Sequence, residues 1–145
     1  MDFKVPVQIR WSDLDPNMHL RHSVYYDWGA MCRVEFFNMH GLTVKAMNEH
    51  KIGPVIFREE CVFKKEIHFG DEVVIDLKLL KARKDFSRWS ICHGIYKGPD
   101  ILAATITLDG AWIDLEKRKL AHPPALVIDL FNDMTHRDEF AWDEK

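Results

Sequence analysis

The sequence predicts an α+β protein in which a long antiparallel β-sheet wraps around one central α-helix. One early segment, residues 24–40, is almost entirely apolar, so a helix there needs cover on most of its sides. After Pro54, long runs with strand character follow one another through short turns, which is typical of an antiparallel sheet. The apolar helix and the apolar face of the sheet can bury each other, which gives one hydrophobic core.

Each element has its own signal. Residues 3–11 alternate apolar with polar side chains, which predicts a strand. Ser23 is suited to cap the apolar helix at its start, and Gly41 is suited to end it. A shorter helix is expected over residues 44–51. Turn residues then separate the later elements. The expected strands are residues 55–69, 72–84, 86–96 and 101–115, and the last helix is residues 124–134.

Length and composition fit a single domain that spans residues 1–145. A chain of 145 residues can bury roughly two thirds of its unfolded surface in one core. Hydrophobic residues make up 47% of the chain and charged residues 30%, as in ordinary globular proteins. We therefore expect the whole chain to fold, except for the charged tail after Phe140.

Charge and apolar segments exclude some classes of protein. A formal net charge of −3 argues against general nucleic-acid binding, which needs a basic face to neutralise phosphates. The start, MDFKVPVQIRW, does not resemble a signal peptide, and no stretch approaches the length of a membrane span. Three cysteines without a CxxC pair indicate reduced, buried thiols in a cytoplasmic protein.

Residues 12–19, SDLDPNMH, place two carboxylates, an amide and an imidazole in a turn just before the apolar helix. Asp and Asn often stabilise turns, and Asp-Pro is a common turn start. If the segment is extended, however, Asp15, Asn17 and His19 point to one side, beside the unpaired N–H groups of the helix start. A carboxylate, an amide, an imidazole and backbone donors together suffice for acyl transfer.

The stretch RWSDLDPNMHLRHSVYYDW, followed by a helix and then by VFKKEIHFGDEV, resembles the hotdog-fold acyl thioesterases. This family includes 4-hydroxybenzoyl-CoA thioesterase and the acyl-CoA and acyl-ACP thioesterases. The similarity extends to TLDGAWIDLEKRK near the end of the chain. It implies the hotdog fold, hydrolysis of an acyl-CoA or acyl-ACP thioester to acid and thiol, and no cofactor. Relatives join their sheets edge to edge and bind substrate between subunits, so a homodimer or homotetramer is expected.

By that resemblance, Asp15 takes the place of the family's catalytic aspartate, which acts as nucleophile or as general base. Asn17 and His19 match the D-x-N-x-H spacing of the plant acyl-ACP type, and Glu66 takes the place of a glutamate that completes that site. His19 and helix N–H groups would hold the oxyanion, while Asn17 and Glu66 would orient water or His19. Two departures are the Arg21-His22 pair, where the plant type has asparagines, and a longer separation between Asp15 and Glu66.

Further residues are candidates for substrate binding. The basic segment KARKDFSRWS is typical of a solvated hairpin end. Relatives bind the nucleotide end of CoA near their later strands and turns, which makes Lys84, Ser87 and Arg88 candidates for that contact. The candidates for an acyl pocket are Tyr25, Trp28 and Phe57.

Other chemistries have weaker signals. His19 and His22 form H-x-x-H, and an ion could be imagined between them and Asp13, Asp15 or His68. The helical context of HExxH is missing, however, and we expect no metal. A serine elbow is absent, and Cys32 lies in an apolar setting where thiols are inert. Two other functions stay open: a non-catalytic acyl-thioester-binding protein, and a hotdog dehydratase or hydratase.

Overall fold

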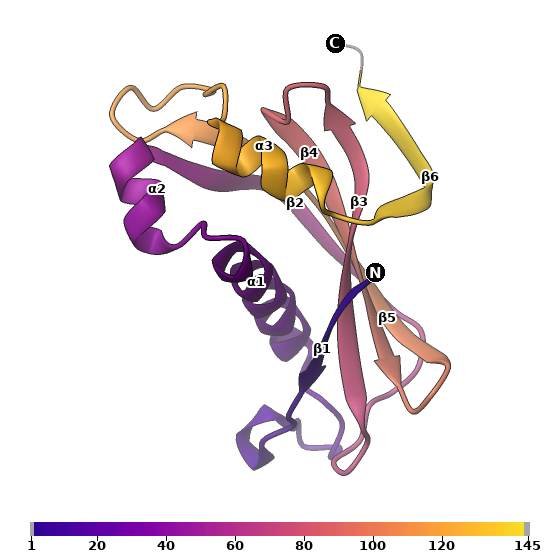
Figure 1. The fold of residues 1–145 in the computed structure, drawn as a ribbon. Helices are drawn as coiled ribbons and strands as arrows, with labels where there is room; N and C mark the ends of the chain where they lie inside the picture. The colour runs from indigo at the N-terminus through magenta and orange to yellow at the C-terminus, as the bar shows by residue number, and fades with distance from the viewer. Residues whose placement is uncertain (1, 144–145) are drawn as a thin grey trace.

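The computed structural model describes residues 2–143. In this part of the chain six strands form one sheet in the order β1-β3-β4-β5-β2, with β6 beside β3. The long helix α1 lies across one face of this sheet (Figure 1). The predicted α+β arrangement of a long sheet against one central helix is therefore confirmed. In chain order the elements are β1 (Phe3–Val7), a 3-10 helix (Trp11–Asp13), α1 (His22–Met39), α2 (Val44–His50), β2 (Ile52–Phe63), β3 (Val73–Arg83), β4 (Arg88–Lys97), β5 (Ile101–Asp114), α3 (Ala125–Asn132) and β6 (His136–Asp143).

The register of the sheet defines two ends. Val7, at the end of β1, lies opposite Val73 at the start of β3, and Val73 lies opposite Lys97 at the end of β4. Phe63, the last residue of β2, pairs with Ala104 near the same end. The β3–β4 turn lies at the other end, where β6 pairs with β3 in parallel. We call these the β1 end and the turn end of the sheet.

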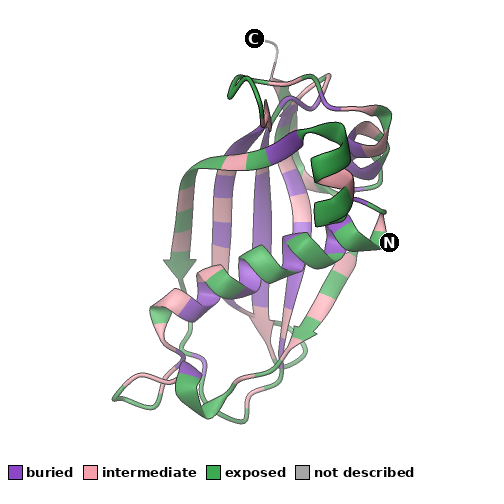
Figure 2. Ribbon diagram, turned by 90° about the vertical axis from the view of Figure 1, so that its left-hand side faces the viewer, coloured by how far each residue is buried: buried purple, intermediate pink, exposed green. Residues whose placement is uncertain are grey.

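Helix α1 buries one face against the sheet and leaves the other exposed (Figure 2). The buried residues are Val24, Tyr25, Trp28, Gly29, Cys32, Arg33, Phe36 and Phe37. Met31, Val34 and Met39 are exposed on the opposite face. The expectation that the helix is covered on most sides is therefore wrong for the single chain, because the sheet reaches only one face.

A polar network lies beneath α1. Arg33 Nη1 donates to His93 Nε2 at 2.9 Å, and His93 Nδ1 donates to the backbone oxygen of Asp76 at 2.7 Å. Arg33 Nη2 also lies 3.7 Å from the Glu59 carboxylate on β2. Burial, and then the Arg33 charge, lower the pKa of His93 from 6.5 to about 3, so the imidazole is neutral at neutral pH. The network therefore connects the helix with three strands.

The first strand is shorter than predicted. It ends at Val7, and Trp11–Asp13 form a 3-10 helix instead of strand. The reason is the Asp13 carboxylate, which is buried and accepts hydrogen bonds from Arg10 N at 2.8 Å and Arg10 Nη2 at 2.9 Å. Burial raises the pKa of Asp13, but the hydrogen bonds and charge of Arg10 outweigh this and keep the pKa below its ordinary value.

The ends of α1 are partly as predicted. Arg21 is the N-cap and His22 the first helical residue, so Ser23 lies inside the first turn and does not cap the helix. At the other end Gly41 has a φ of +85°, the left-handed conformation that glycine adopts without strain. The predicted stop of the helix is therefore confirmed.

Two segments near the sheet differ from the sequence prediction. Strand β2 begins at Ile52 and ends at Phe63, so residues 64–69 leave the sheet. They run instead beside the SDLDPNMH turn, where Leu20 N donates to Ile67 O at 2.8 Å. At the C-terminus, β6 reaches Asp143, although the tail after Phe140 was expected not to fold. Pairing with β3 explains this order, and the ring of Trp142 adds to it by packing against Phe86, with 5.8 Å between the ring centroids.

The cysteines are unpaired, as predicted. Cys32 and Cys92 are buried, whereas Cys61 is only half-buried. Burial raises the pKa of the Cys32 thiol to about 12, which agrees with an inert side chain. Within residues 2–143 no helix is both long and apolar enough to cross a membrane.

Candidate active site

The SDLDPNMH turn is closed by the Asp15 carboxylate. Its Oδ1 accepts hydrogen bonds from Asn17 N at 2.9 Å and His19 N at 3.1 Å. Asp15 N also donates to His19 O at 2.8 Å, so the two residues face each other at the base of the turn. Pro16 lies in the turn, and Met18 takes a positive φ of 66°. The side chain of Asp15 is thereby held in one orientation.

This geometry rules out the extended conformation that would place Asp15, Asn17 and His19 on one side. Because the chain reverses between Asp15 and His19, the three polar residues do not alternate along one face. Asn17 lies near the tip of the turn, is exposed and does not line the neighbouring cavity. Asp15 and His19 do line that cavity. The Asx-type turn, in which a side chain replaces a backbone acceptor, is the physical reason for the reversal.

A cavity of about 310 Å³ lies between this turn, the start of α1 and the segment after β2. It brings together four residues that the sequence analysis names as site candidates: Asp15, His19, Tyr25 and Glu66. The other lining residues are Leu20, His22, Phe63, Lys64, Lys65 and Ile67. The imidazole, the phenol and one carboxylate therefore come from neighbouring parts of the chain, residues 15–25, whereas the second carboxylate comes from the distant segment after β2.

Tyr25 lies on the first turns of α1 and forms part of the cavity wall. Its ring packs edge-on against Phe63 at 4.9 Å. Burial raises the pKa of Tyr25 to about 12, and the charges of Cys61, Asp15 and Glu66 act in the same direction. The phenol is therefore protonated at neutral pH and can donate a hydrogen bond into the cavity.

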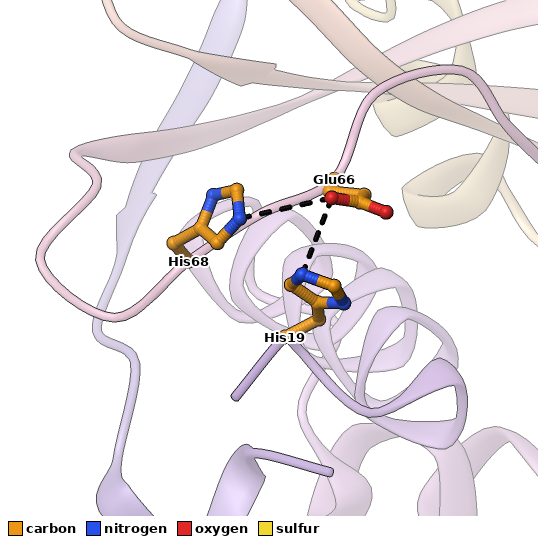
Figure 3. Close-up of side chains that lie close together, drawn as sticks. All are labelled: His19, Glu66 and His68. Atoms are coloured by element: carbon orange, nitrogen blue, oxygen red, sulfur yellow. Dashed lines mark ion pairs between the residues drawn. The ribbon is translucent and has the colours of Figure 1, made fainter. Parts of the chain in front are cut away.

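His19 and Glu66 contact each other at one edge of the cavity. The distance from His19 Nε2 to Glu66 Oε2 is 3.2 Å, and His68 Nε2 lies 3.7 Å from the same oxygen (Figure 3). An isolated antiparallel bridge between His19 and His68 holds the two backbone segments together. The structure thus joins His19 to Glu66, as the resemblance implies, and adds His68, which the sequence offered only as one of several partners in an imagined metal site.

The residues expected to bind the nucleotide end of CoA lie at the turn end of the sheet, away from Asp15. Ser87 is buried, and its hydroxyl donates to Asp85 Oδ1 at 2.7 Å, so it stabilises the β3–β4 turn. Lys84 is exposed, and Arg88 lies over the ring of Phe57 at 5.4 Å. Within one chain these residues and the cavity do not meet. Their role in binding stays a prediction.

The other acyl-pocket candidates do not line the 310 Å³ cavity either. Trp28 is buried, whereas Phe57 is exposed near Arg88. Phe63 lines the cavity with its aromatic ring instead. The two consecutive lysines Lys64 and Lys65 line it as well. A signal for these residues was present, because VFKK directly precedes Glu66 in the sequence. Because the strand was predicted to continue to residue 69, these residues were not recognised as lying at the end of β2.

The comparisons with known proteins agree with this architecture. The model of the thioesterase-like superfamily matches residues 9–134. The chain therefore belongs to the thioesterase-like superfamily, and the predicted hotdog fold is confirmed. No curated protein sequence matches the chain.

Solved structures of similar fold include a Staphylococcus aureus protein in complex with CoA, with a TM-score of 0.83 and 17% identity over 99% of this chain and 90% of that one. A 1,4-dihydroxy-2-naphthoyl-CoA thioesterase from Synechocystis has a TM-score of 0.81 and 16% identity, covering 94% of this chain and all of the other (100%). A Thermus thermophilus thioesterase complexed with coenzyme A and Zn has a TM-score of 0.72 and 22% identity, covering 89% and 90%. At these identities the likeness shows the fold.

Proposed function

We propose that this protein is a thioester hydrolase that cleaves acyl-CoA or acyl-ACP to a free acid and a thiol. The observation that carries the proposal is the single cavity that Asp15, His19, Tyr25 and Glu66 share. Similar folds that bind CoA, or that are named as CoA thioesterases, support the choice of substrate class.

Asp15 is the residue that starts the reaction in this proposal. Two backbone N–H groups on Oδ1 orient its carboxylate, which then attacks the thioester carbonyl or removes a proton from the attacking water. The carbonyl oxygen gains negative charge at this stage. Tyr25, His19 and N–H groups in the first turn of α1 are the available donors. Glu66, 3.2 Å from His19 Nε2, holds the imidazole in place.

The leaving group needs little help. A thiol with a pKa of roughly 8 to 9 departs as a thiolate, so the site can work without a dedicated general acid for that step. Phe63 and Leu20 offer apolar surface to the acyl group. Lys64 and Lys65 provide positive charge for the phosphates of CoA or of a phosphopantetheine arm.

Assembly would bring the remaining candidates closer to this cavity. Strand β2 is the outermost strand on one side of the sheet, and it exposes Ile56, Phe57, Val62 and Phe63. If β2 pairs with β2 of a second copy around a two-fold axis, the start of one strand lies beside the end of the other. The region of Arg88 and Phe57 would then approach the partner's cavity. We therefore propose a homodimer joined at β2.

The direct test is thiol release by the purified protein from short, medium, long and aromatic acyl-CoAs and from acyl-ACP. Release from at least one class, with the free acid as second product, is the expected result. Binding of CoA esters without release would favour the non-catalytic binding protein instead. A change in a double bond of an enoyl or β-hydroxyacyl thioester without thiol release would favour the dehydratase or hydratase.

A further inference from the structure

Three ligand-type side chains converge at one edge of the cavity. His19, Glu66 and His68, which we call the HEH cluster, each offer one nitrogen or oxygen atom, and all three atoms lie within 4.8 Å of one another (Figure 3). His68 has no part in the reaction proposed above. Its ring nevertheless lies edge-on against that of His19, with 4.9 Å between the centroids.

The backbone fixes the positions of these residues. His19 and His68 are neighbours in an antiparallel bridge, and Leu20 N donates to Ile67 O at 2.8 Å in the same pairing. Glu66 and His68 are two residues apart on one of the two segments, a spacing that puts side chains on the same side of an extended chain. The cluster is therefore formed by two paired segments and not by a flexible loop.

Distances in the HEH cluster are close to those of a zinc site. A tetrahedral zinc ion with ligand bonds of about 2.0–2.1 Å holds neighbouring ligand atoms about 3.4 Å apart. Here Glu66 Oε2 lies 3.2 Å from His19 Nε2 and 3.7 Å from His68 Nε2. All three ligand atoms lie within 4.8 Å of one another, and rotation of the exposed Glu66 and His68 side chains would bring them to the spacing of a zinc site.

The carboxylate of Asp71 lies beside His68, on the side of the ring away from Glu66. Asp71 Oδ2 accepts a hydrogen bond from His68 N at 2.8 Å and lies 3.8 Å from His68 Nδ1. In metal sites, a carboxylate near the outer ring nitrogen of a histidine orients the ring and leaves the other nitrogen for the ion. The Asp71 position fits this role, because His68 Nε2 faces Glu66.

We propose that the HEH cluster binds a divalent transition-metal ion such as Zn²⁺, with His19 Nε2, Glu66 Oε2 and His68 Nε2 as its protein ligands. Two imidazoles and one carboxylate are a ligand set that zinc accepts, and one position stays open to water. This proposal replaces the sequence-based expectation of no metal. The H-x-x-H pattern pairs His19 with His22, whereas in the structure it is His68, one of the further partners that the sequence offered, whose ligand atom clusters with that of His19.

Metal binding has a consequence that rests on the proposed function. An ion on the HEH cluster occupies the imidazole of His19 and the carboxylate of Glu66, the two groups that assist Asp15. Zn²⁺ is then an inhibitor of thioester hydrolysis, and the cluster is a site through which metal availability controls the enzyme.

The test is a calorimetric titration of the full chain with Zn²⁺ at neutral pH, repeated with Co²⁺ while recording visible absorption. We expect one ion per chain and the absorption bands of a four-coordinate Co²⁺ site. His68→Gln is expected to weaken Zn²⁺ binding at least tenfold. His22→Gln is the matched control, because it removes a histidine from the same cavity but not from the HEH cluster, and it is expected to bind as the wild type does.

Absence of binding by the folded wild-type chain overturns the proposal, and so does unchanged binding by folded His68→Gln. Loss of binding in His22→Gln with retention in His68→Gln also overturns it, in favour of an H-x-x-H site. None of these results depends on turnover, so a failure of the proposed hydrolase activity leaves the metal site separately testable. Where thiol release is measurable, Zn²⁺ is expected to inhibit the wild type and to inhibit His68→Gln at least tenfold less.

Discussion

The Asp15 carboxylate has a structural partner set and a proposed chemical role in the same turn. Its Oδ1 closes the turn through the backbone N–H groups of Asn17 and His19. A carboxylate fixed in this way loses little conformational entropy when it meets a substrate. Asp15 can therefore stabilise the turn and also act in catalysis. Activity measurements are needed to distinguish the two roles.

Tyr25 permits one such measurement at the level of a single atom. Tyr25→Phe keeps the ring that packs on Phe63 and removes only the hydroxyl group. If the protonated phenol helps hold the oxyanion, kcat for thioester hydrolysis should fall about tenfold to a hundredfold, or about 1.4–2.7 kcal/mol, with little change in KM. The melting temperature, measured in parallel, should stay close to that of the wild type. An unchanged kcat would remove Tyr25 from the proposed machinery.

His93 makes stability depend on pH. Its pKa is about 3 in the folded chain and 6.5 ordinarily, so the unfolded chain takes up a proton that the folded chain does not. The free energy of unfolding is therefore highest above about pH 6.5. It decreases as the pH falls toward 3, by up to about 1.4 kcal/mol for each pH unit. Arg33, Asp76 and Glu59 surround the group, and the neutral imidazole links Arg33 to Asp76.

Urea unfolding at several pH values between 7.5 and 5 measures this dependence. His93→Gln should be less stable than the wild type at pH 7.5 but should lose less stability on acidification. His50→Gln, which changes an exposed histidine on α2, should keep the wild-type slope. Equal slopes for wild type and His93→Gln would contradict the assignment.

At the level of elements, the contact between α1 and the sheet depends on Gly29. A Cβ at this position would lie 3.3 Å from Ile106 Cδ1 and 3.3 Å from Arg33 Nη1. Gly29→Val should therefore lower the free energy of unfolding by about 1–3 kcal/mol, because the helix must move away from the sheet. Ala30→Val, on the neighbouring exposed position, should have a much smaller effect. Equal melting temperatures for the two variants would show that α1 accommodates the added side chain.

The sequence predicted some secondary-structure elements and not others. The apolar pattern of residues 24–40 and the long strand-like runs predicted the helix and the main strands, because burial imposes these periods. The reversal within SDLDPNMH could not be read from them, since it depends on hydrogen bonds from Asp15 Oδ1 to its own turn. Likewise β6, HRDEFAWD, has few apolar residues, and its order comes from pairing with β3.

The candidate site was predictable in part for the same reason. Asp15, His19 and Glu66 could be named from the resemblance, and the structure places them around one cavity. The contact between His68 and His19 could not be predicted, because it arises from pairing of two segments almost fifty residues apart. Lys84, Ser87 and Arg88 lie at the turn end of the sheet, so one chain alone does not bring them to the cavity, and their predicted role would require the proposed dimer.

At the level of the whole molecule, the β2 edge is the surface expected to join two copies. Val62→Lys places a charge on this edge, where the side chain is 44% exposed in the single chain. We expect light scattering after gel filtration to give a dimer or tetramer for the wild type and a monomer for the variant. Ile101→Lys, which changes a similarly exposed apolar residue at the start of β5, should keep the wild-type mass. A monomeric wild type would contradict assembly through β2.

The most direct test of the proposed function compares kcat/KM for thiol release by Asp15→Asn with that of the wild type. Asp100→Asn, at an exposed position in the β4–β5 turn, serves as the matched control. We expect a loss of at least about a hundredfold for Asp15→Asn, or about 2.7 kcal/mol of transition-state stabilisation, with retained folding and a fully active control. Equal activity of folded Asp15→Asn and wild type would show that the SDLDPNMH turn is not the active site.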